Sequence, residues 1–300
     1  MIRPLSYLFY FLFIVLSMPI IRGQKVIVLG NLQDGGAPQH GCELGCCSNP
    51  QPNEYVSSLG VYSDTSAILI DATPDFVIQA KHLEHISRLP LKGIFLTHAH
   101  MGHYTGLVHL GREAANTKNT EVFAMPRMSE FLKSNGPWNQ LVVLENIRLN
   151  PLSTEKSIQI DSGINITPLL VPHRDEFSET VGFIISGLRR KLLYIPDIDK
   201  WNVWNQSLEQ MLKEVDFALI DGTFLKDGEV NRPMSEIPHP FIVETTSLLD
   251  SLQTKEKNKV WFTHFNHTNP VRFKSNKDRI KLEAEGYHFA SFGTEFDLKD

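Results

Sequence analysis

Three histidines fall within six residues of this 300-residue chain, in the run Thr97-His98-Ala99-His100-Met101-Gly102-His103. His98 and His100 are two positions apart, so in an extended segment both imidazoles point to the same side. His103 stands at the start of a predicted helix and reaches the same space from a second direction. Neutral imidazole nitrogens bind zinc at about 2.0 Å. The spacing therefore predicts a metal site rather than a packed or solvated histidine cluster.

Three further potential ligands each follow the end of a short apolar run, namely His173, Asp197 and His264. A catalytic zinc usually takes three protein ligands and leaves a position for water. We expect His98, His100 and His173 to supply those three ligands. The carboxylate of Asp197 is expected to bind the ion, bridge to a second ion or orient the metal-bound water.

Other residues near these strand ends are candidates for supporting roles. His103 and His264 would complete a second metal site. His267, three residues beyond His264, is a candidate for contact with substrate or for proton transfer, as His103 is. Asp199 is expected to cap the helix that follows it, which favours Asp197 as the ligand. The candidate catalytic residues are Asp197, His103 and His267.

Three more residues have two interpretations each. Asp221 ends an apolar run and either caps a turn or hydrogen-bonds a ligating histidine. His239 lies between two prolines in a loop that lines either the cavity or the surface. Arg174 suits a carboxylate or phosphate of a substrate, or it pairs with Asp175 or Glu179.

These ligands require a framework that brings strand ends together. Apolar runs predict strands over 25–29, 66–70, 93–96, 121–124, 164–171, 181–185, 192–195, 217–220 and 260–263. Helical patterns cover 104–116, 127–134, 202–213, 242–252 and 277–285, and Thr73 with Pro74 predicts the start of one more helix. Many strands, some close enough for hairpins and some separated by helices, indicate two packed sheets with helices outside.

The composition is that of a folded domain, with 42% hydrophobic and 21% charged residues. The net charge of -5 comes from 29 basic and 34 acidic residues without long blocks, which gives no surface for a phosphate backbone. We therefore expect a small-molecule substrate and no nucleic acid partner. No repeat or linker divides the chain, so residues 24–300 are expected to form a single domain.

Residues 1–23 contain a long aromatic and apolar run after Arg3 and no acidic residue. This composition predicts a signal peptide and export to the periplasm or the exterior. A retained membrane anchor is the alternative, because Ile21-Arg22-Gly23 matches a cleavage site poorly. This segment is the chain's expected contact with a membrane.

Cys42, Cys46 and Cys47 lie together in a loop rich in turn-forming residues. In an oxidising compartment, a disulfide within the loop or a chemically inert loop is favoured. A small structural metal site that uses His40 with the cysteines is the competing interpretation.

The order of these motifs resembles the metallo-β-lactamase fold superfamily, whose pattern is His-x-His-x-Asp-His followed by a later His, Asp and His on strand ends. The matching positions are His98, His100, His103, His173, Asp197 and His264. The resemblance implies an α/β fold, a four-layer αββα sandwich with a metal site at one edge. Within the superfamily, the chain is most similar to the pyrroloquinoline quinone biosynthesis protein B branch, through residues 27–30, 35–39, 221–224 and 263–270.

Two departures accompany this resemblance. Gly102 occupies the superfamily's aspartate position, which removes a second-site carboxylate and favours one dominant ion. The branch is expected to be cytoplasmic and to lack the His-x-His pair, unlike this chain. The leading expectation is an exported hydrolase with one or two zinc ions, whose metal-bound hydroxide attacks an ester, lactam or phosphodiester. The alternatives are an iron-dependent oxidative enzyme related to that branch and a non-catalytic small-molecule carrier.

Overall fold

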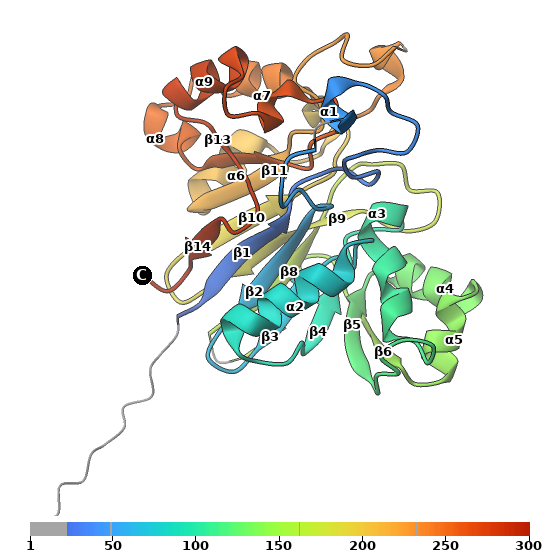
Figure 1. Ribbon diagram of the computed structural model, residues 1–300. Helices are drawn as coiled ribbons and strands as arrows, with labels where there is room; N and C mark the ends of the chain where they lie inside the picture. Colours follow the sequence, from blue (N-terminus) through green and yellow to red (C-terminus); the bar gives the residue numbers. More distant parts are fainter. Residues whose placement is uncertain (1–22, 49, 162, 232) are drawn as a thin grey trace, which may run out of the picture.

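The computed structural model describes residues 23–300 except 49, 162 and 232, and shows two sheets packed face to face (Figure 1). The first sheet has the order β14-β1-β2-β3-β4-β5-β6. Its strands are β1 (Lys25–Gly30), β2 (Ser58–Tyr62), β3 (Ala67–Ile70), β4 (Gly93–Phe95), β5 (Thr120–Ala124), β6 (Ile147–Pro151) and β14 (Glu295–Asp297). The second sheet has the order β13-β12-β11-β10-β9-β8-β7. Its strands are β7 (Ile158–Gln159), β8 (Asn165–Leu170), β9 (Val181–Ser186), β10 (Lys191–Ile195), β11 (Phe217–Asp221), β12 (Val260–Thr263) and β13 (His288–Phe289).

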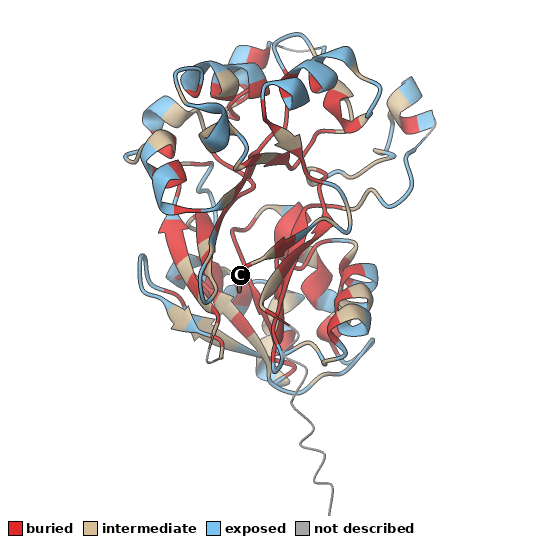
Figure 2. Ribbon diagram, turned by 90° about the vertical axis from the view of Figure 1, so that its left-hand side faces the viewer, coloured by how far each residue is buried: buried red, intermediate tan, exposed pale blue. Residues whose placement is uncertain are grey.

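The central strands are apolar on both faces, because each sheet is covered on both sides. In β1, Val26 and Val28 face the layer between the sheets, whereas Ile27 and Leu29 face the outer helices. In β10, Tyr194 packs between the sheets and Leu193 packs outward. Successive side chains of a strand point to opposite faces. These continuous apolar runs therefore produce three buried layers, and the burial pattern in Figure 2 shows buried strands between exposed helical surfaces.

Helices cover the outer faces of both sheets and give the four-layer αββα architecture that the sequence predicts (Figure 1). The helices beside the first sheet are α2 (Phe76–Ser87), α3 (Met101–Tyr104), α4 (Pro126–Ser134) and α5 (Trp138–Val143). Those beside the second sheet are α6 (Leu208–Glu214), α7 (Ile242–Leu248), α8 (Thr254–Lys257) and α9 (Lys277–Ala284). The short α1 (Gly45–Ser48) lies in the loop after β1, and the 3-10 turns are η1 (Thr105–Leu110), η2 (Trp201–Val203), η3 (Met234–Glu236) and η4 (Pro270–Arg272).

Parallel pairing brings the carboxyl ends of several strands to one edge. In the first sheet β3 and β4 are parallel, and in the second sheet β10, β11 and β12 are parallel. Strand β8 also runs in the direction of β10, because both are antiparallel to β9. The loops that leave these strands therefore meet at the same edge.

Several predicted helix boundaries are wrong. The helix predicted over 104–116 is replaced by α3 and the 3-10 turn η1. Here Gly106 N donates to Ala72 O, and a Cβ on Gly106 would lie 2.6 Å from the Cβ of Phe76, so close packing against the β3–α2 loop dictates the backbone. The helix predicted over 202–213 begins at Leu208, after Ser207 accepts a hydrogen bond from Gln210 N. Similarly, α7 ends at Leu248 rather than at 252.

The helix expected to start at Pro74 begins instead at Phe76. Thr73 accepts from Asp75 N at 3.0 Å and donates to Gln79 Oε1 at 2.7 Å, so its hydroxyl forms a turn before the helix. The predicted leader lies, apart from Gly23, outside the described residues. Within the described part of the chain, no helix has both the length and the apolar character needed to cross a bilayer.

Candidate metal centre

The first three predicted histidine ligands surround one carboxylate at the shared strand edge. Asp197 follows β10, and its Oδ2 lies 3.3 Å from His98 Nε2 and 3.7 Å from His100 Nδ1. Its Oδ1 lies 3.1 Å from His173 Nε2, which follows β8. Ligand atoms of all four residues lie within 4.8 Å of one another. The structure therefore brings together the four side chains that the sequence places in the first site.

The remaining predicted ligands lie on the other side of the same carboxylate. The Nε2 atoms of His103 and His264 are 4.0 and 3.9 Å from Asp197 Oδ2. His264 follows β12 directly and has a φ of 61°, a left-handed conformation that turns the chain sharply at the strand end. His239 also reaches the carboxylate, with Nδ1 3.2 Å from Asp197 Oδ1. Asp197 thus lies between two groups of imidazoles.

The atoms that face one another in this cluster have no hydrogen-bond partner among the described residues. This holds for Asp197 Oδ1 and for the Nε2 atoms of His98, His103, His173 and His264, all of which are buried. Buried polar atoms without partners are costly, at about 1–3 kcal/mol each. A cation among them would remove that cost, because imidazole nitrogens and carboxylate oxygens are the donors that zinc and iron bind. The donor set therefore fits a metal centre.

Hydrogen bonds on the outer sides of the rings hold two of these histidines in position. His103 Nδ1 lies 2.7 Å from Asp71 Oδ2, and Asp71 follows β3 in the centre of the protein. The hydroxyl of Thr97 donates to Asp71 at 2.9 Å and accepts from His98 Nδ1 at 2.9 Å. With the ring proton on Nδ1, each Nε2 lone pair faces the cluster.

The second sheet repeats this arrangement. Thr223 donates its hydroxyl hydrogen to Asp221 Oδ1 at 2.7 Å and accepts from His264 Nδ1 at 3.0 Å. Asp221 Oδ2 also accepts from His239 Nδ1 at 2.8 Å. Asp221 thus hydrogen-bonds a histidine that contacts Asp197, and it also accepts from the backbone N–H of Thr223, as a turn cap does. His239 is buried and lines the cavity rather than the surface.

The predicted cap at Asp199 is wrong. The residue preceding the 3-10 turn η2 is Lys200, and no side chain caps that turn. Instead Asp199 Oδ1 accepts from His173 Nδ1 at 3.0 Å. Asp199 therefore orients the ring of His173, whose Nε2 faces Asp197.

Protonation equilibria in the cluster are strongly perturbed. Burial, reinforced by the positive charge of His103, holds the pKa of His98 well below its usual value. Burial alone would lower the pKa of His173, but the Asp197 and Asp199 carboxylates outweigh it and raise this pKa to about 10. Burial opposes ionisation of Asp197, yet the surrounding imidazoles hold its pKa well below the usual range. A metal ion that binds here must therefore displace protons from imidazole nitrogens.

A cavity of about 440 Å³ adjoins the cluster and is lined by His239, Arg174, Gln33, Gln39, Phe224 and Asn266 among others. Arg174 Nη2 lies 3.3 Å from His100 Nε2. The carboxylates of Asp175 and Glu179, its alternative partners, hydrogen-bond elsewhere, to Thr180 and to the backbone N–H of Arg127 respectively. The guanidinium therefore lies at the boundary between the cluster and the cavity.

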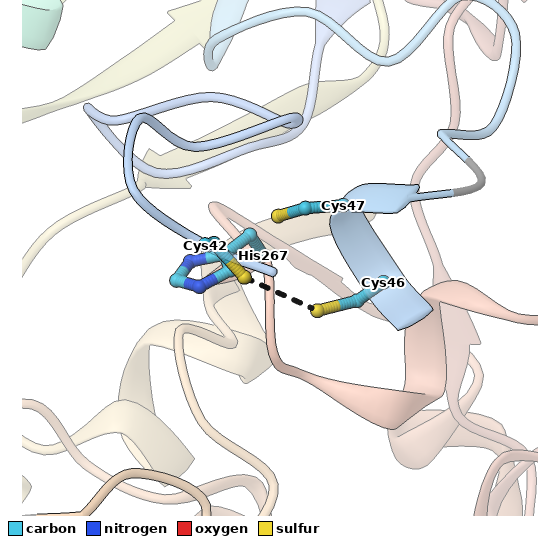
Figure 3. A group of neighbouring side chains, drawn as sticks. All are labelled: Cys42, Cys46, Cys47 and His267. Carbon is cyan, nitrogen blue, oxygen red and sulfur yellow. Dashed lines mark hydrogen bonds between the residues drawn. The ribbon is translucent and has the colours of Figure 1, made fainter. Parts of the chain in front are cut away.

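His267 lines the same cavity, but its ring lies beside the three cysteines rather than beside the other histidines (Figure 3). The three cysteines are free thiols, and the Cys42 and Cys46 sulfurs are 4.0 Å apart, well beyond the S–S bond length of about 2.05 Å. The disulfide expected in this loop is therefore absent from the structure. One ligand atom from each of Cys42, Cys46, Cys47 and His267 lies within 4.8 Å of the others, so His267 replaces His40 as the candidate fourth ligand.

Sequence reasoning missed three residues of the centre. Asp71 and Thr97 belong to no recognised motif, although each directly follows a predicted strand, 66–70 and 93–96 respectively. Asp34 lies in the loop after β1, and its Oδ1 is 3.1 Å from His103 Nε2. Its sequence signal is weak, because a single acid in a glycine-rich loop is more often a turn residue.

Curated relatives align with almost the whole chain. Coenzyme PQQ synthesis protein B of Methylorubrum extorquens is 25% identical over 91% of this chain and 99% of its own length. The protein of the same name from Rhizobium meliloti is also 25% identical, over 91% and 98% of the two chains.

Solved structures share the fold. Zinc-bound PqqB from Methylobacterium extorquens has a TM-score of 0.73 at 21% identity, covering 91% of this chain and all of that one. A diphosphatase of the PhnP family has a TM-score of 0.66 at 22% identity, covering 92% and 98%. The short form of human tRNase Z has a TM-score of 0.56 at 15% identity, covering 92% and 100%. The family model of the beta-lactamase superfamily domain matches residues 66–265, and the chain therefore belongs to the β-lactamase superfamily, with the metallo-β-lactamase fold.

Proposed function

We propose that this protein is a metal-dependent hydrolase of a small molecule. The observation that carries the proposal is the set of buried Nε2 atoms and the Asp197 oxygen that face one another without hydrogen-bond partners. His98, His100 and His173 would hold the first ion, with Asp197 completing or bridging the centre. Bound zinc would supply activated water near neutral pH and polarise the oxygen of the bond to be cleaved.

The chain's own residues have separate tasks in this proposal. Asp71 and Asp221 hold the imidazoles through their Nδ1 atoms, either directly or through a threonine hydroxyl, and so prevent the rings from rotating. Asp197 holds or orients the water to be activated, because its carboxylate is ionised and faces the centre. His103 would accept or return a proton there when no ion is bound to its Nε2. His267 borders the cavity and is the outer candidate for proton transfer.

The cavity favours a small substrate with an anionic group. Arg174 supplies a cation beside His100, and guanidinium groups pair well with carboxylate and phosphate. Two proteins with the same fold are named as a diphosphatase and a tRNase, which supports a phosphoester among the substrates to test. We therefore propose screening phosphodiesters first, then carboxylic esters and lactams.

Elemental analysis tests the proposal before a substrate is known. The purified protein is compared with its His98→Ala and Asp197→Ala variants, and His85→Ala serves as the control because His85 is exposed on α2. We expect near-stoichiometric zinc in the protein and the control, less zinc in both site variants, and hydrolysis that falls with it. Full metal content and activity in both site variants would contradict the proposal.

A second candidate function is iron-dependent oxidation of a small molecule. It is supported by the similarity to Coenzyme PQQ synthesis protein B, which extends over 91% of this chain. Histidine and carboxylate ligands also suit iron. Coloured protein that contains iron and loses it in the His98→Ala variant would favour this function over hydrolysis. A protein that binds no metal after reconstitution would exclude both and leave a non-catalytic carrier.

We further propose that residues 1–23 direct export of the chain and are then removed. The support is their apolar, aromatic composition without an acidic residue. Expression of the full chain in a secreting host, followed by N-terminal sequencing of the product, tests this. A start near residue 24 in the exported fraction is expected, whereas an intact N-terminus in the membrane fraction would indicate a retained anchor.

A further inference from the structure

We propose that Asp34 is a metal ligand and that, with His103, His264 and Asp197, it holds a second ion in this centre. The inference rests on the metal centre of the proposed function. It assigns a ligand from the loop after β1, outside the matched domain at 66–265.

The first argument is geometric. Asp34 Oδ1 lies 3.1 Å from His103 Nε2 and 3.8 Å from His264 Nε2. The same two nitrogens lie 4.0 and 3.9 Å from Asp197 Oδ2. Donors around a tetrahedral zinc with bonds of about 2.0–2.1 Å are about 3.3 Å apart. Ligand atoms of Asp34, His103 and His264 lie within 4.8 Å of one another, and the separations of 3.1 and 3.8 Å from Asp34 bracket that value. Small shifts would therefore place these three donors around one ion, which Asp197 would approach from the other side.

The second argument concerns the lone pairs. His103 Nδ1 donates to Asp71 Oδ2 at 2.7 Å, so the neutral ring has no hydrogen left on Nε2. The same holds for His264, whose Nδ1 donates to Thr223 Oγ1 at 3.0 Å. In their neutral forms, both rings therefore point the Nε2 lone pair at the Asp34 oxygen.

The two Nε2 lone pairs and the Asp34 oxygen repel one another unless a proton or a metal ion lies between them. A proton on one ring would pair only that ring with Asp34, whereas a metal ion can bind both rings and the carboxylate at once. Asp34 Oδ1 and both Nε2 atoms are buried and have no hydrogen-bond partner among the described residues. The Asp34 side chain as a whole is 29% exposed, so Oδ1 is the atom turned inward.

The third argument is that the backbone fixes Asp34 beside His264. Phe265, the residue after His264, donates its N–H to Asn31 O at 2.7 Å and accepts from Gln33 N at 2.9 Å. Leu32 forms parallel bridges with both Val56 and Phe265. The segment that carries Asp34 is thus hydrogen-bonded to the segment that carries His264, and its position does not depend on a flexible loop.

Gly102 provides the space for this arrangement. A Cβ on residue 102 would lie 2.6 Å from Asp34 Cα and 2.8 Å from Asp34 Cγ, closer than side chains pack. The absence of a side chain at position 102 is therefore coupled to the presence of Asp34. The sequence-based expectation of one dominant ion assumed that glycine leaves the second site without a carboxylate, and Asp34 supplies one.

The test is metal stoichiometry, measured in a Cys42→Ser/Cys46→Ser background so that thiolates do not bind zinc. The chelator-treated protein is titrated with zinc against a chromophoric competitor, and bound zinc is counted by elemental analysis. The variants are Asp34→Ala and Asp34→Asn, with His264→Ala as a second ligand of the same ion. Glu43→Gln is the matched control, because Glu43 is an exposed carboxylate in the same loop.

We expect two zinc ions in the background protein and the Glu43→Gln control, and one in Asp34→Ala and His264→Ala. Asp34→Asn keeps the shape of the side chain but replaces the anionic oxygen with a neutral amide. It should weaken binding of the second ion by at least about 10-fold, the smallest loss typical even of an outer-shell change. The Asp34→Ala/His264→Ala double variant should still hold one ion, since both changes remove the same site. Far-UV circular dichroism confirms that each variant is folded, and Asp34→Asn decides the question if Asp34→Ala is not.

Two outcomes would overturn the inference while leaving the proposed function intact. One is two ions of unchanged affinity in both Asp34 variants. The other is a single ion in the background protein that His98→Ala removes and Asp34→Asn does not weaken. A background protein that binds no zinc would instead refute the proposed function, and this inference with it.

Discussion

Two groups of potential ligands border the same cavity, one through His239 and the other through His267, and they are built in different ways. The Asp197 cluster is buried, and its rings are held from behind by Asp71, Asp199 and Asp221. The cysteine group consists of half-exposed side chains, apart from buried Cys47, in a loop that contains only the four-residue helix α1. Hydrogen bonds of its thiols join Cys42 to Cys46 and to Cys47, and Cys47 also accepts from the backbone N–H of Gln39.

The difference shows how ligand geometry is fixed in this fold. In the cluster, strand ends and buried carboxylates place each imidazole before any ion arrives, at the cost of several unpaired buried atoms. In the cysteine group, the positions of the sulfur atoms depend on a loop and on the four-residue helix α1. We therefore expect changes in the cluster to affect stability and metal together, and changes in the cysteine group to affect local reactivity.

The largest expected effect comes from Asp71→Ala. This carboxylate is fully buried and accepts from the His103 ring, the Thr97 hydroxyl and the Thr97 N–H. Breaking such a buried pair costs about 3–5 kcal/mol. We expect urea denaturation to show a loss of that size, together with weaker zinc binding. The control is Asp250→Asn, because Asp250 is 88% exposed; equal losses in both variants would contradict the role given to Asp71.

A smaller effect is expected from Thr223→Val, which removes one hydroxyl from between Asp221 and His264. The ring of His264 would lose its Nδ1 acceptor, and second-sphere changes of this kind lower metal affinity by about 10–100-fold. Competition with a chromophoric chelator measures the affinity. An unchanged zinc affinity would show that packing alone orients His264.

The thiols should differ in their reactivity toward iodoacetamide as the pH rises. A hydrogen bond from Cys47 lowers the pKa of Cys42, whereas burial raises the pKa of Cys46 to about 11. Because only the thiolate reacts, Cys42 should be modified first, and its rate should reach its plateau at a lower pH. Peptide mass spectrometry after timed quenching follows each site.

Preincubation with zinc extends the same experiment. Slower alkylation of all three thiols would support a metal site formed with His267, whereas unchanged rates would favour an inert loop. Modification of Cys46 before Cys42 would contradict the environments described for the two sulfurs.

The smallest expected effect is that of Cys46→Ser on stability. Cys46 is half-buried on α1, which makes few contacts with the core, so the free energy of unfolding should change by about 0.5 kcal/mol or less. Thermal unfolding monitored by circular dichroism is sufficient to check it. If Cys46→Ser lowered the free energy of unfolding as much as Asp71→Ala does, the cysteine group and the Asp197 cluster would not differ in their contribution to stability.

The layers of the fold and most of the cluster could be predicted from the sequence. Continuous apolar runs such as 192–195 identify strands that are buried on both faces. Short apolar runs followed by His98, His173, Asp197 and His264 indicate that potential metal ligands gather at one edge of the sheets. These signals are local, because a strand's burial and its last residue are both read from neighbouring positions. Helix boundaries after His103 and Asp199 were less predictable, since tertiary hydrogen bonds replaced local helical preference there.

The polar residues that support the potential ligands could not be predicted in this way, because tertiary contacts place them. Asp34 is 230 positions from His264 and lies beside it because backbone hydrogen bonds join residues 31–33 to Phe265. His267 faces the thiols, and Asp199 faces His173, for the same reason: both are placed by contacts with distant segments. A carboxylate in a loop has no periodic signature, so its partner becomes visible only when two sheets pack and bring their strand ends together.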